Sequence, residues 1–179
     1  MSTTDMNEKL SQHKQWVTLK SGKKIFLRPI LPTDDHLLLD LFNKMSPQSR
    51  YLRFLSHHQT LSDDLLYRFT HLNYDDEFAI AAVVKEEELD CIVAVARYTN
   101  NRLENIADLA IAVRDDWQHS GLGTLLLSRV IDIGKEHGIN RFGSMMDPQN
   151  TAVKKVIQKL GYEFTYYFRD GMYQVEILV

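Results

Sequence analysis

The chain has 179 residues, of which 44% are hydrophobic and 25% charged, with a formal net charge of -3 at pH 7. This length and composition are typical of one ordinary globular domain, and the slight negative charge disfavours a nucleic-acid-binding surface. No apolar run reaches the roughly 18 residues of a membrane span, and no signal peptide is recognisable, so we expect a cytoplasmic protein that binds neither nucleic acid nor membrane.

The N-terminal half predicts a strand followed by helices. Residues 1–15 are polar and mixed in charge, and we expect a flexible tail there before a single domain over residues 16–179. Residues 24–28 are typical of a strand that ends at Pro29 and follows a hairpin turn at 21–23. Apolar residues at helical spacing predict three helices, over residues 34–44, over 47–56 and from Ser62 to Phe69.

From Phe78 the pattern changes to strands. Three apolar runs separated by polar turns predict an antiparallel meander over residues 78–84, 91–98 and 108–113. The later elements are predicted as a helix over residues 121–136, a strand over 141–146, a helix from Asn150 to Gly161 and a hairpin of 164–168 and 173–179. The predicted fold is therefore α+β, with a mixed, mainly antiparallel central sheet flanked by helices. The only cysteine, Cys91, lies in an apolar strand, which favours a buried structural thiol and excludes a cysteine-based metal cluster.

One turn is the most informative stretch of the sequence. Gln118-His119-Ser120-Gly121-Leu122-Gly123 joins the apolar run 109–113 to the helix that follows. A strand, a glycine turn and a helix in that order aim the free N–H groups of the helix at the turn, which favours an anion such as a phosphate. The pattern differs from both the P-loop and the dinucleotide fingerprint. We expect a phosphorylated ligand here, while a turn that uses glycine only for its backbone freedom is the alternative.

These residues resemble a known family. Gln118-x-x-Gly121-x-Gly123 is similar to the (R/Q)-x-x-G-x-(G/A) signature of the GNAT superfamily of acyl-CoA N-acyltransferases, and Asn150 with Leu160-Gly161-Tyr162 resembles its second signature. Ser46-Pro47-Gln48-Ser49-Arg50-Tyr51-Leu52-Arg53-Phe54 and Leu72-Asn73-Tyr74-Asp75 resemble the acetyltransferase domain of bacterial Pat-type protein-lysine acetyltransferases. The resemblance covers residues 16–179. It implies a metal-independent N-acetyltransferase that uses acetyl-CoA and acts on an amine, for which a protein lysine is the first expectation.

The resemblance also implies which residues bind the cosubstrate. The turn would hold the pyrophosphate of acetyl-CoA through its backbone, at Gln118, His119, Ser120, Gly121, Leu122, Gly123 and Thr124. The main chain of Ile111, Ala112 and Val113 would pair with the pantetheine arm as an added strand does. Asn150 would contact the CoA arm, or cap its own helix, or both.

A base must remove a proton from the acceptor, because the pKa of a lysine amine is about 10.4. The Pat-type domains place a glutamate ten residues before the Gln118 position, which corresponds to Asp108 here. Aspartate is one methylene shorter, so a water would have to bridge the remaining distance. Glu104 is the nearest alternative base, Asp75, Asp76 and Glu77 come after it, and a purely structural carboxylate at position 108 is also open.

Many GNAT enzymes carry a tyrosine that acts as general acid at the position of Ile157. For Ile157 we predict a packing role alone. Two other functions fit the same sequence. One is an acetyltransferase for a small amine, and the other is an acetyl-CoA-binding module in which the change to aspartate at 108 marks lost activity. The sequence predicts no oligomeric state.

Overall fold

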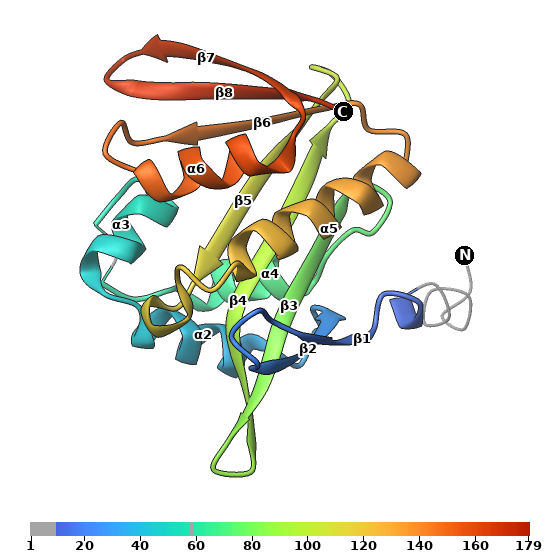
Figure 1. Cartoon of the computed structure of the whole chain (residues 1–179), viewed down its shortest axis with the longest axis vertical. Coiled ribbons are helices and arrows are strands. Elements are labelled where there is room, and N and C mark those ends of the chain that lie inside the picture. The colour runs from blue at the N-terminus through green and yellow to red at the C-terminus, as the bar shows by residue number, and fades with distance from the viewer. Residues whose placement is uncertain (1–9, 58) are drawn as a thin grey trace.

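One twisted sheet of eight strands organises the chain (Figure 1). This computed structural model describes residues 10–57 and 59–179. The strands are β1 (Gln15–Thr18), β2 (Lys24–Pro29), β3 (Glu77–Glu86), β4 (Leu89–Asn101), β5 (Ile106–Val113), β6 (Arg141–Met146), β7 (Glu163–Arg169) and β8 (Met172–Leu178). Their spatial order is β1-β2-β3-β4-β5-β6-β8-β7, and neighbours are antiparallel except for β5 and β6, which are parallel. The predicted α+β class with a mixed, mainly antiparallel sheet is confirmed.

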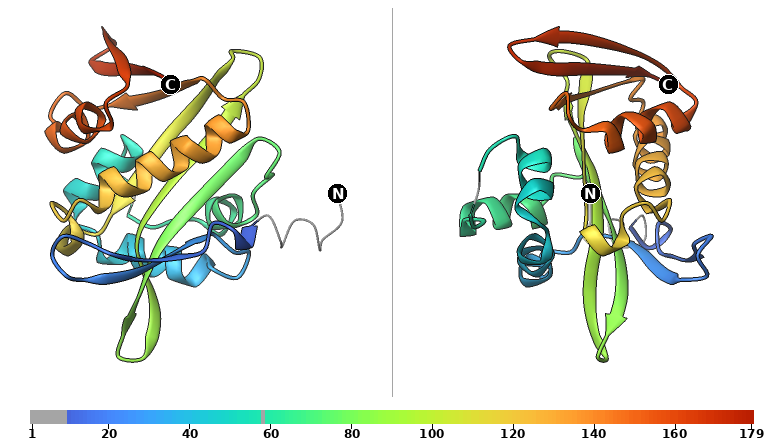
Figure 2. Two further views of the ribbon diagram at one scale, coloured as in Figure 1. Left: turned by 45° about the vertical axis from the view of Figure 1, so that its right-hand side comes forward. Right: turned by 60° about the vertical axis from the view of Figure 1, so that its left-hand side comes forward.

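Helices cover both faces of the sheet (Figure 2). They are α2 (Asp35–Lys44), α3 (Pro47–Phe54), α4 (Asp63–Thr70), the short 3-10 helix η1 (Asp115–Trp117), α5 (Leu122–Glu136) and α6 (Thr151–Leu160). Helices α2, α3 and α4 pack on one face, and α5 and α6 pack on the other, so the sheet separates two apolar clusters. Within the described ranges, no helix has both the length and the apolar character needed to cross a membrane.

A buried ion pair positions α2 behind β2. The guanidinium of Arg28 donates to both carboxylate oxygens of Asp34, at 2.6 and 2.8 Å, and Asp34 also accepts from the backbone N–H of Leu31. Arg28 and Asp34 are 8% and 3% exposed. Removing one partner of such a pair leaves an uncompensated buried charge, so the contact fixes the turn from the sheet into the helical layer.

Most predicted elements lie where the periodicity places them, with three differences. The predicted helix over 47–56 ends at Phe54, because Leu55 adopts a left-handed conformation with φ 54°. Strand β4 continues to Asn101 because it pairs with β3 as far as Thr99 and with β5 as far as Asn101. Strand β1 was not predicted. The predicted tail falls on residues 1–9, which lie outside the described residues, and on 10–15, where Gln15 already belongs to β1.

Gly134 in α5 allows this helix to approach the sheet closely. An added Cβ would lie 2.5 Å from Cζ of Phe142 and 3.4 Å from a ring carbon of Tyr98, and all three residues are buried. Alanine normally favours a helix over glycine by about 1 kcal/mol. Here we expect Gly134→Ala to lower the free energy of unfolding by about 1–2 kcal/mol instead, since overpacking a core costs about 1–3 kcal/mol.

Chemical denaturation measures this effect. The matched control is Ser128→Ala, a half-buried position of the same helix, which we expect to change the free energy of unfolding by less than about 0.5 kcal/mol. A Gly134→Ala protein as stable as the parent would contradict the close packing of α5 on Phe142.

Candidate functional site

Strands β5 and β6 separate after two residue pairs. Ala107 pairs with Phe142 and Asp108 with Gly143; β6 then continues along β8, while β5 continues along β4 as far as Val113. Figure 1 shows β6 leaving β5 at a wide angle. Within the described residues, the β6-facing edge of β5 beyond Asp108 therefore has no partner strand. At about 3.3 Å per residue this open edge is about 17 Å long, and an extended ligand can pair with such an edge.

The turn between β5 and α5 lies at the open end of this gap. Gln118 is extended, whereas His119 and Gly121 adopt left-handed conformations with φ 59° and 86°. Backbone N–H groups in such alternating turns form a concave anion-binding surface. The first N–H groups of α5 have no carbonyl one turn earlier, and the helix dipole places positive potential at the same point. This geometry could hold a phosphate group.

Side chains of the turn bind to the protein, and two of its backbone N–H groups are also used, that of Gln118 by the Asp115 carbonyl and that of Leu122 by the Ser120 hydroxyl. The Gln118 amide donates to the Val113 carbonyl at 3.2 Å and to the Ser49 hydroxyl at 3.1 Å. The Ser120 hydroxyl donates to the Trp117 carbonyl at 2.6 Å. These bonds connect the turn to the end of β5, to α3 and to η1. They hold the turn in one conformation before a ligand arrives.

Asp115 connects the same turn to the start of α3. Its carboxylate accepts from the Ser46 N–H at 2.9 Å, from the Ser46 hydroxyl at 2.7 Å and from the Ser49 hydroxyl at 2.8 Å. Burial raises the pKa of Asp115, but these hydrogen bonds favour the charged form and the net pKa is lowered. Although Asp115 is acidic, its charge is compensated by donors from α3.

Apolar side chains close the gap on the side of α5 and α6. An added Cβ at Gly123 would meet Ile111, Val113 and Val156 at 3.7 to 3.9 Å. Ile111 and Val113 therefore point toward these helices. Ala112, the residue between them, packs on the opposite face, against the α2–α4 layer. The main chain of these three residues forms the open edge of β5.

Asn150 caps α6. It is 6% exposed, and its side-chain oxygen accepts from the Val153 N–H at 3.2 Å, so the capping alternative is confirmed. The contact of Asn150 with the CoA arm stays a prediction. Ile157 is 2% exposed within the core cluster on the α5 side, which confirms its predicted packing position.

Asp108 lies at the closed end of the gap. Strand alternation places its side chain with Ala110 and Ala112, on the face that α2, α3 and α4 cover. Solvent reaches the carboxylate, yet the protein atoms around it raise its pKa, and the positive charges of Arg53 and Arg97 oppose that rise. A carboxyl with a raised pKa is a better proton acceptor than an ordinary aspartate.

The rival carboxylates are engaged or distant. Glu77 lies in the same row of the sheet as Asp108, with Thr99 between them, but it pairs with Arg97 at 3.3 Å. Asp76 forms an ion pair with Arg102. Glu104 is exposed in the turn before β5. Among these carboxylates, Asp108 alone lies at the closed end of the β5–β6 gap.

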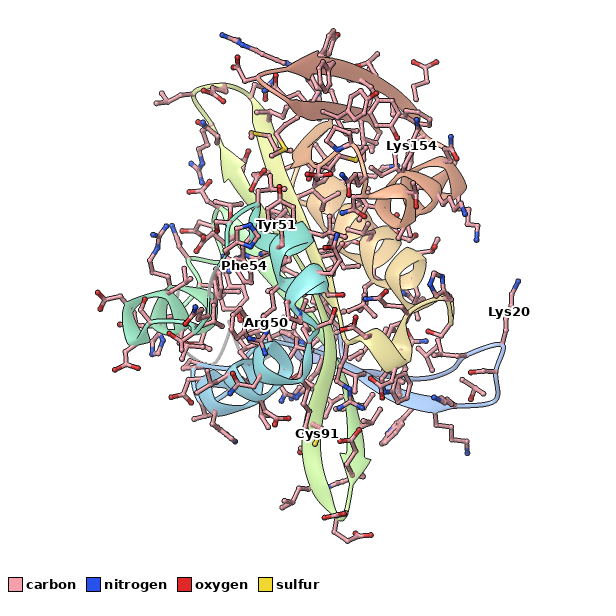
Figure 3. The ribbon with its side chains drawn as sticks, turned by 90° about the vertical axis from the view of Figure 1, so that its left-hand side faces the viewer. Lys20, Arg50, Tyr51, Phe54, Cys91 and Lys154 are labelled. Carbon is pink, nitrogen blue, oxygen red and sulfur yellow. The ribbon has the colours of Figure 1, made fainter. Side chains whose placement is uncertain are left out.

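A pocket that no sequence pattern indicated lies between the α2–α4 layer and the sheet. It encloses about 510 Å³ of empty space, part of it open to solvent. Figure 3 shows Phe54 reaching from α3 toward α4, beside this pocket. Two guanidinium groups interrupt an otherwise apolar lining formed by Leu38, Leu41, Phe42, Met45, Arg53, Phe54, Leu61, Phe69, Ala79, Val95, Arg97 and Ala112.

The two arginines differ in their partners. Arg97 pairs with Glu77 and lies 5.0 Å from the ring centre of Phe69. Burial and, next, the charge of Arg97 lower the pKa of Arg53 to about 10, while Asp108 opposes this shift. Arg53 lies in a stretch that carried the family resemblance. No pattern in the sequence, however, indicated that Arg97 of β4 would lie beside it.

Cys91 is buried, as predicted, and burial raises the pKa of its thiol. Over residues 10–57 and 59–179, no three His, Cys, Asp or Glu side chains come together as metal ligands would.

Comparisons with known proteins agree with the resemblance. A family model described as an acetyltransferase (GNAT) domain matches residues 24–163. An acetyltransferase of Pseudomonas aeruginosa is 28% identical over 148 residues, which cover 82% of this chain and 80% of that protein. Acetyltransferase Pat of Mycolicibacterium smegmatis is 30% identical over 146 residues, or 81% of this chain, and the match spans 43% of that longer protein. The crystal structure of the GNAT domain of S. lividans PAT matches with a TM-score of 0.86 at 27% identity, covering 94% of this chain and 98% of that one.

The packing role of Ile157 gives a testable expectation. Ile157→Val should lower the free energy of unfolding by about 0.5–1.5 kcal/mol, as loss of one buried methylene does. Any activity of the folded protein should stay within about threefold of the parent, because the side chain contacts only the core. Thermal melting and an activity assay measure the two effects. A hundredfold loss of activity with unchanged melting would give Ile157 a role beyond packing.

Proposed function

The chain belongs to the GNAT acetyltransferase family and is an N-acetyltransferase, and on this premise we propose that it moves the acetyl group of acetyl-CoA to an amine, with Asp108 as base. One observation carries the proposal. The gap between β5 and β6 has an anion-binding turn at its open end and a carboxylate of raised pKa at its closed end. A cosubstrate with a phosphate at one end and a reactive group at the other fits this arrangement.

In this proposal acetyl-CoA binds in the gap, with its pyrophosphate at the open end and its thioester at the closed end. The pyrophosphate binds the backbone N–H groups of residues 118–124, and the pantetheine arm pairs with the open edge of β5 at residues 111–113. The arm then runs along the strand toward Asp108, which brings the thioester to the closed end of the gap. Asn150 borders the gap from the start of α6.

The chemical step needs a neutral amine. Asp108 accepts a proton from the acceptor ammonium, directly or through one water, and the amine nitrogen attacks the thioester carbonyl carbon. The tetrahedral intermediate collapses as the C–S bond breaks and the extra proton on nitrogen passes to the departing sulfur, which yields the acetylated amine and CoA. A thiol resembling cysteine has a pKa of about 8.5, so CoA can leave as a thiolate without a strong general acid. Ile157 at the usual tyrosine position is compatible with this step.

For the acceptor we propose a protein lysine. The support is the likeness to Acetyltransferase Pat and to the GNAT domain of S. lividans PAT, together with the local resemblance of residues 46–54 and 72–75 to the Pat-type domains. An assay of CoA release with lysine-bearing proteins and with small amines separates this acceptor from a small-molecule one. Acetyl-CoA binding without CoA release from any acceptor would favour the non-catalytic alternative.

His119 provides a test of the anion-binding turn. Its side chain is exposed and its backbone is left-handed, a conformation that Asp and Asn adopt more readily than most residues. We expect His119→Asp to weaken acetyl-CoA binding at least about tenfold, because a negative charge then faces the pyrophosphate. The neutral variant His119→Asn should bind within about threefold of the parent.

Isothermal titration calorimetry of both variants measures this difference, and 0.5 M salt should reduce it by screening. Equal affinities for His119→Asp and His119→Asn would place the pyrophosphate elsewhere. Gly123→Asp is a poorer probe, because its side chain would enter the apolar contact with Ile111, Val113 and Val156.

Asp108→Asn tests the base. We expect turnover to fall about 10²–10⁴-fold with acetyl-CoA affinity unchanged, which is the usual cost of losing a general base. The loss should shrink as the pH rises toward the amine pKa of about 10.4, where the acceptor is already neutral. In the parent enzyme, activity should fall at acidic pH as Asp108 becomes protonated, and the raised pKa of Asp108 moves this fall to higher pH than an ordinary aspartate would give.

Two further variants serve as controls. Asp108→Glu should retain activity, because it restores the residue of the Pat-type domains. Glu104→Gln should have no effect, because Glu104 lies outside the gap. Full activity of Asp108→Asn together with a loss in Glu104→Gln would transfer the role of base to Glu104.

A further inference from the structure

Arg53 places a positive charge without a contacting partner at the pocket beneath α2, α3 and α4. It is half-buried, and no hydrogen bond or ion pair joins its guanidinium to any residue in the part of the chain that the structure describes. Its guanidinium lies over the ring of Phe54, 4.9 Å from the ring centre. A charge among apolar side chains is costly unless an opposite charge comes to it.

Two neighbouring arginines, Arg97 and Arg50, do have hydrogen-bond partners in the protein. Arg97 donates to Glu77 at 3.3 Å, and its side chain is 12% exposed. Arg50, three residues before Arg53 on α3, donates to the backbone carbonyls of Phe42, Asn43 and Met45. Each of these guanidinium groups has a hydrogen-bond partner within the protein. Of the three, Arg53 alone has none among the described residues.

The register of the sheet places Arg97 between the pocket and Asp108, and Arg53 of α3 lies nearby. Val95 pairs with Ala112, Arg97 with Ala110, and Thr99 with Asp108. The first pair lines the pocket, and the last contains the proposed base. Arg97 therefore lies in the row between them, and Arg53 of α3 is near enough to influence both Arg97 and Asp108.

This charge pattern is unfavourable for a simple amine. An acceptor ammonium that approaches Asp108 meets two guanidinium groups, and only one of them is compensated by a protein carboxylate in contact with it. A carboxylate on the same acceptor removes this mismatch, because guanidinium and carboxylate form strong paired hydrogen bonds. The apolar surroundings strengthen that attraction relative to water.

We propose that Arg53 binds a carboxylate of the acceptor, so that this enzyme prefers amines accompanied by a nearby carboxylate. The inference rests on the proposed function and specifies its substrate class. In a protein acceptor the carboxylate is an Asp or Glu side chain next to the lysine, and in a small acceptor it belongs to the same amino acid. Arg53 also lies in the last turn of α3, where a cation complements the helix dipole. A role limited to the dipole would not discriminate between acceptors.

Matched acceptor pairs test the preference. One pair is an ω-amino acid and its carboxamide, and the other is a lysine peptide with glutamate or glutamine beside the lysine. CoA release gives kcat and KM for each acceptor with the parent, with Arg53→Gln and with Arg53→Lys. The control variant is Arg68→Gln, which removes an exposed positive charge on α4 that does not line the pocket.

For the parent and for Arg68→Gln we expect kcat/KM to favour the carboxylate member of at least one pair about tenfold or more, mainly through KM. Arg53→Gln should abolish this preference with the carboxamide or glutamine acceptor little affected, and Arg53→Lys should keep part of it. The responding pair identifies whether the acceptor is a small molecule or a protein. Equal kcat/KM within both pairs, or an equal loss for both members in Arg53→Gln, would overturn the inference and leave the acetyltransferase activity standing.

A binding measurement separates the two proposals if no acceptor turns over. Calorimetry of the carboxylate acceptors against the parent and Arg53→Gln proteins, with CoA present, reports on Arg53 without chemistry. Binding that is lost in Arg53→Gln would support the carboxylate site even though none of these acceptors is acetylated. Absence of such binding would overturn the inference as well.

Discussion

The parallel pairing of β5 with β6 lasts for only two residue pairs, and the site depends on that limit. Hydrogen bonds hold β5 to β4 up to Val113, whereas β6 pairs with β8, so β5 and β6 must diverge. The divergence leaves backbone N–H and C=O groups of β5 open to a ligand. Continued pairing would have satisfied these groups within the sheet and closed the gap. The incomplete pairing of the sheet therefore leaves the open edge on which the proposed cosubstrate site depends.

A network of hydrogen bonds holds the turn between β5 and α5 at the open end of the gap. Gln118 bonds to the last carbonyl of β5, and Ser46 and Ser49 of the α3 region bond to Asp115 and Gln118. This network joins the cosubstrate side of the molecule to the helix that also carries Arg53. A turn whose conformation is set before binding loses little entropy when it binds a phosphate. The same bonds fix the helix that borders the acceptor side.

Opposing effects act on the proposed base. The protein atoms around Asp108 raise its pKa, which improves it as a proton acceptor, while the charges of Arg53 and Arg97 oppose that rise. The two arginines come from α3 and β4, and neither is near Asp108 in the sequence. In the proposed mechanism their charges also face the acceptor, so one arrangement would affect both the base and the choice of amine.

The sequence by itself determined the order of the helices and strands, because apolar periodicity and turn residues act locally; 141–146 was predicted to the residue. It also determined the glycine turn before α5, since the left-handed conformation of Gly121 and the start of a helix are local properties. Only the tertiary structure decided where β5 and β6 separate, because pairing depends on competition among strands far apart in the chain. It also decided that Asn150 caps α6 and that Arg53 and Arg97 meet near Asp108. Arg53 and Arg97 belong to different layers of the fold, and the spacing of residues in the sequence does not predict how close their charges lie to Asp108.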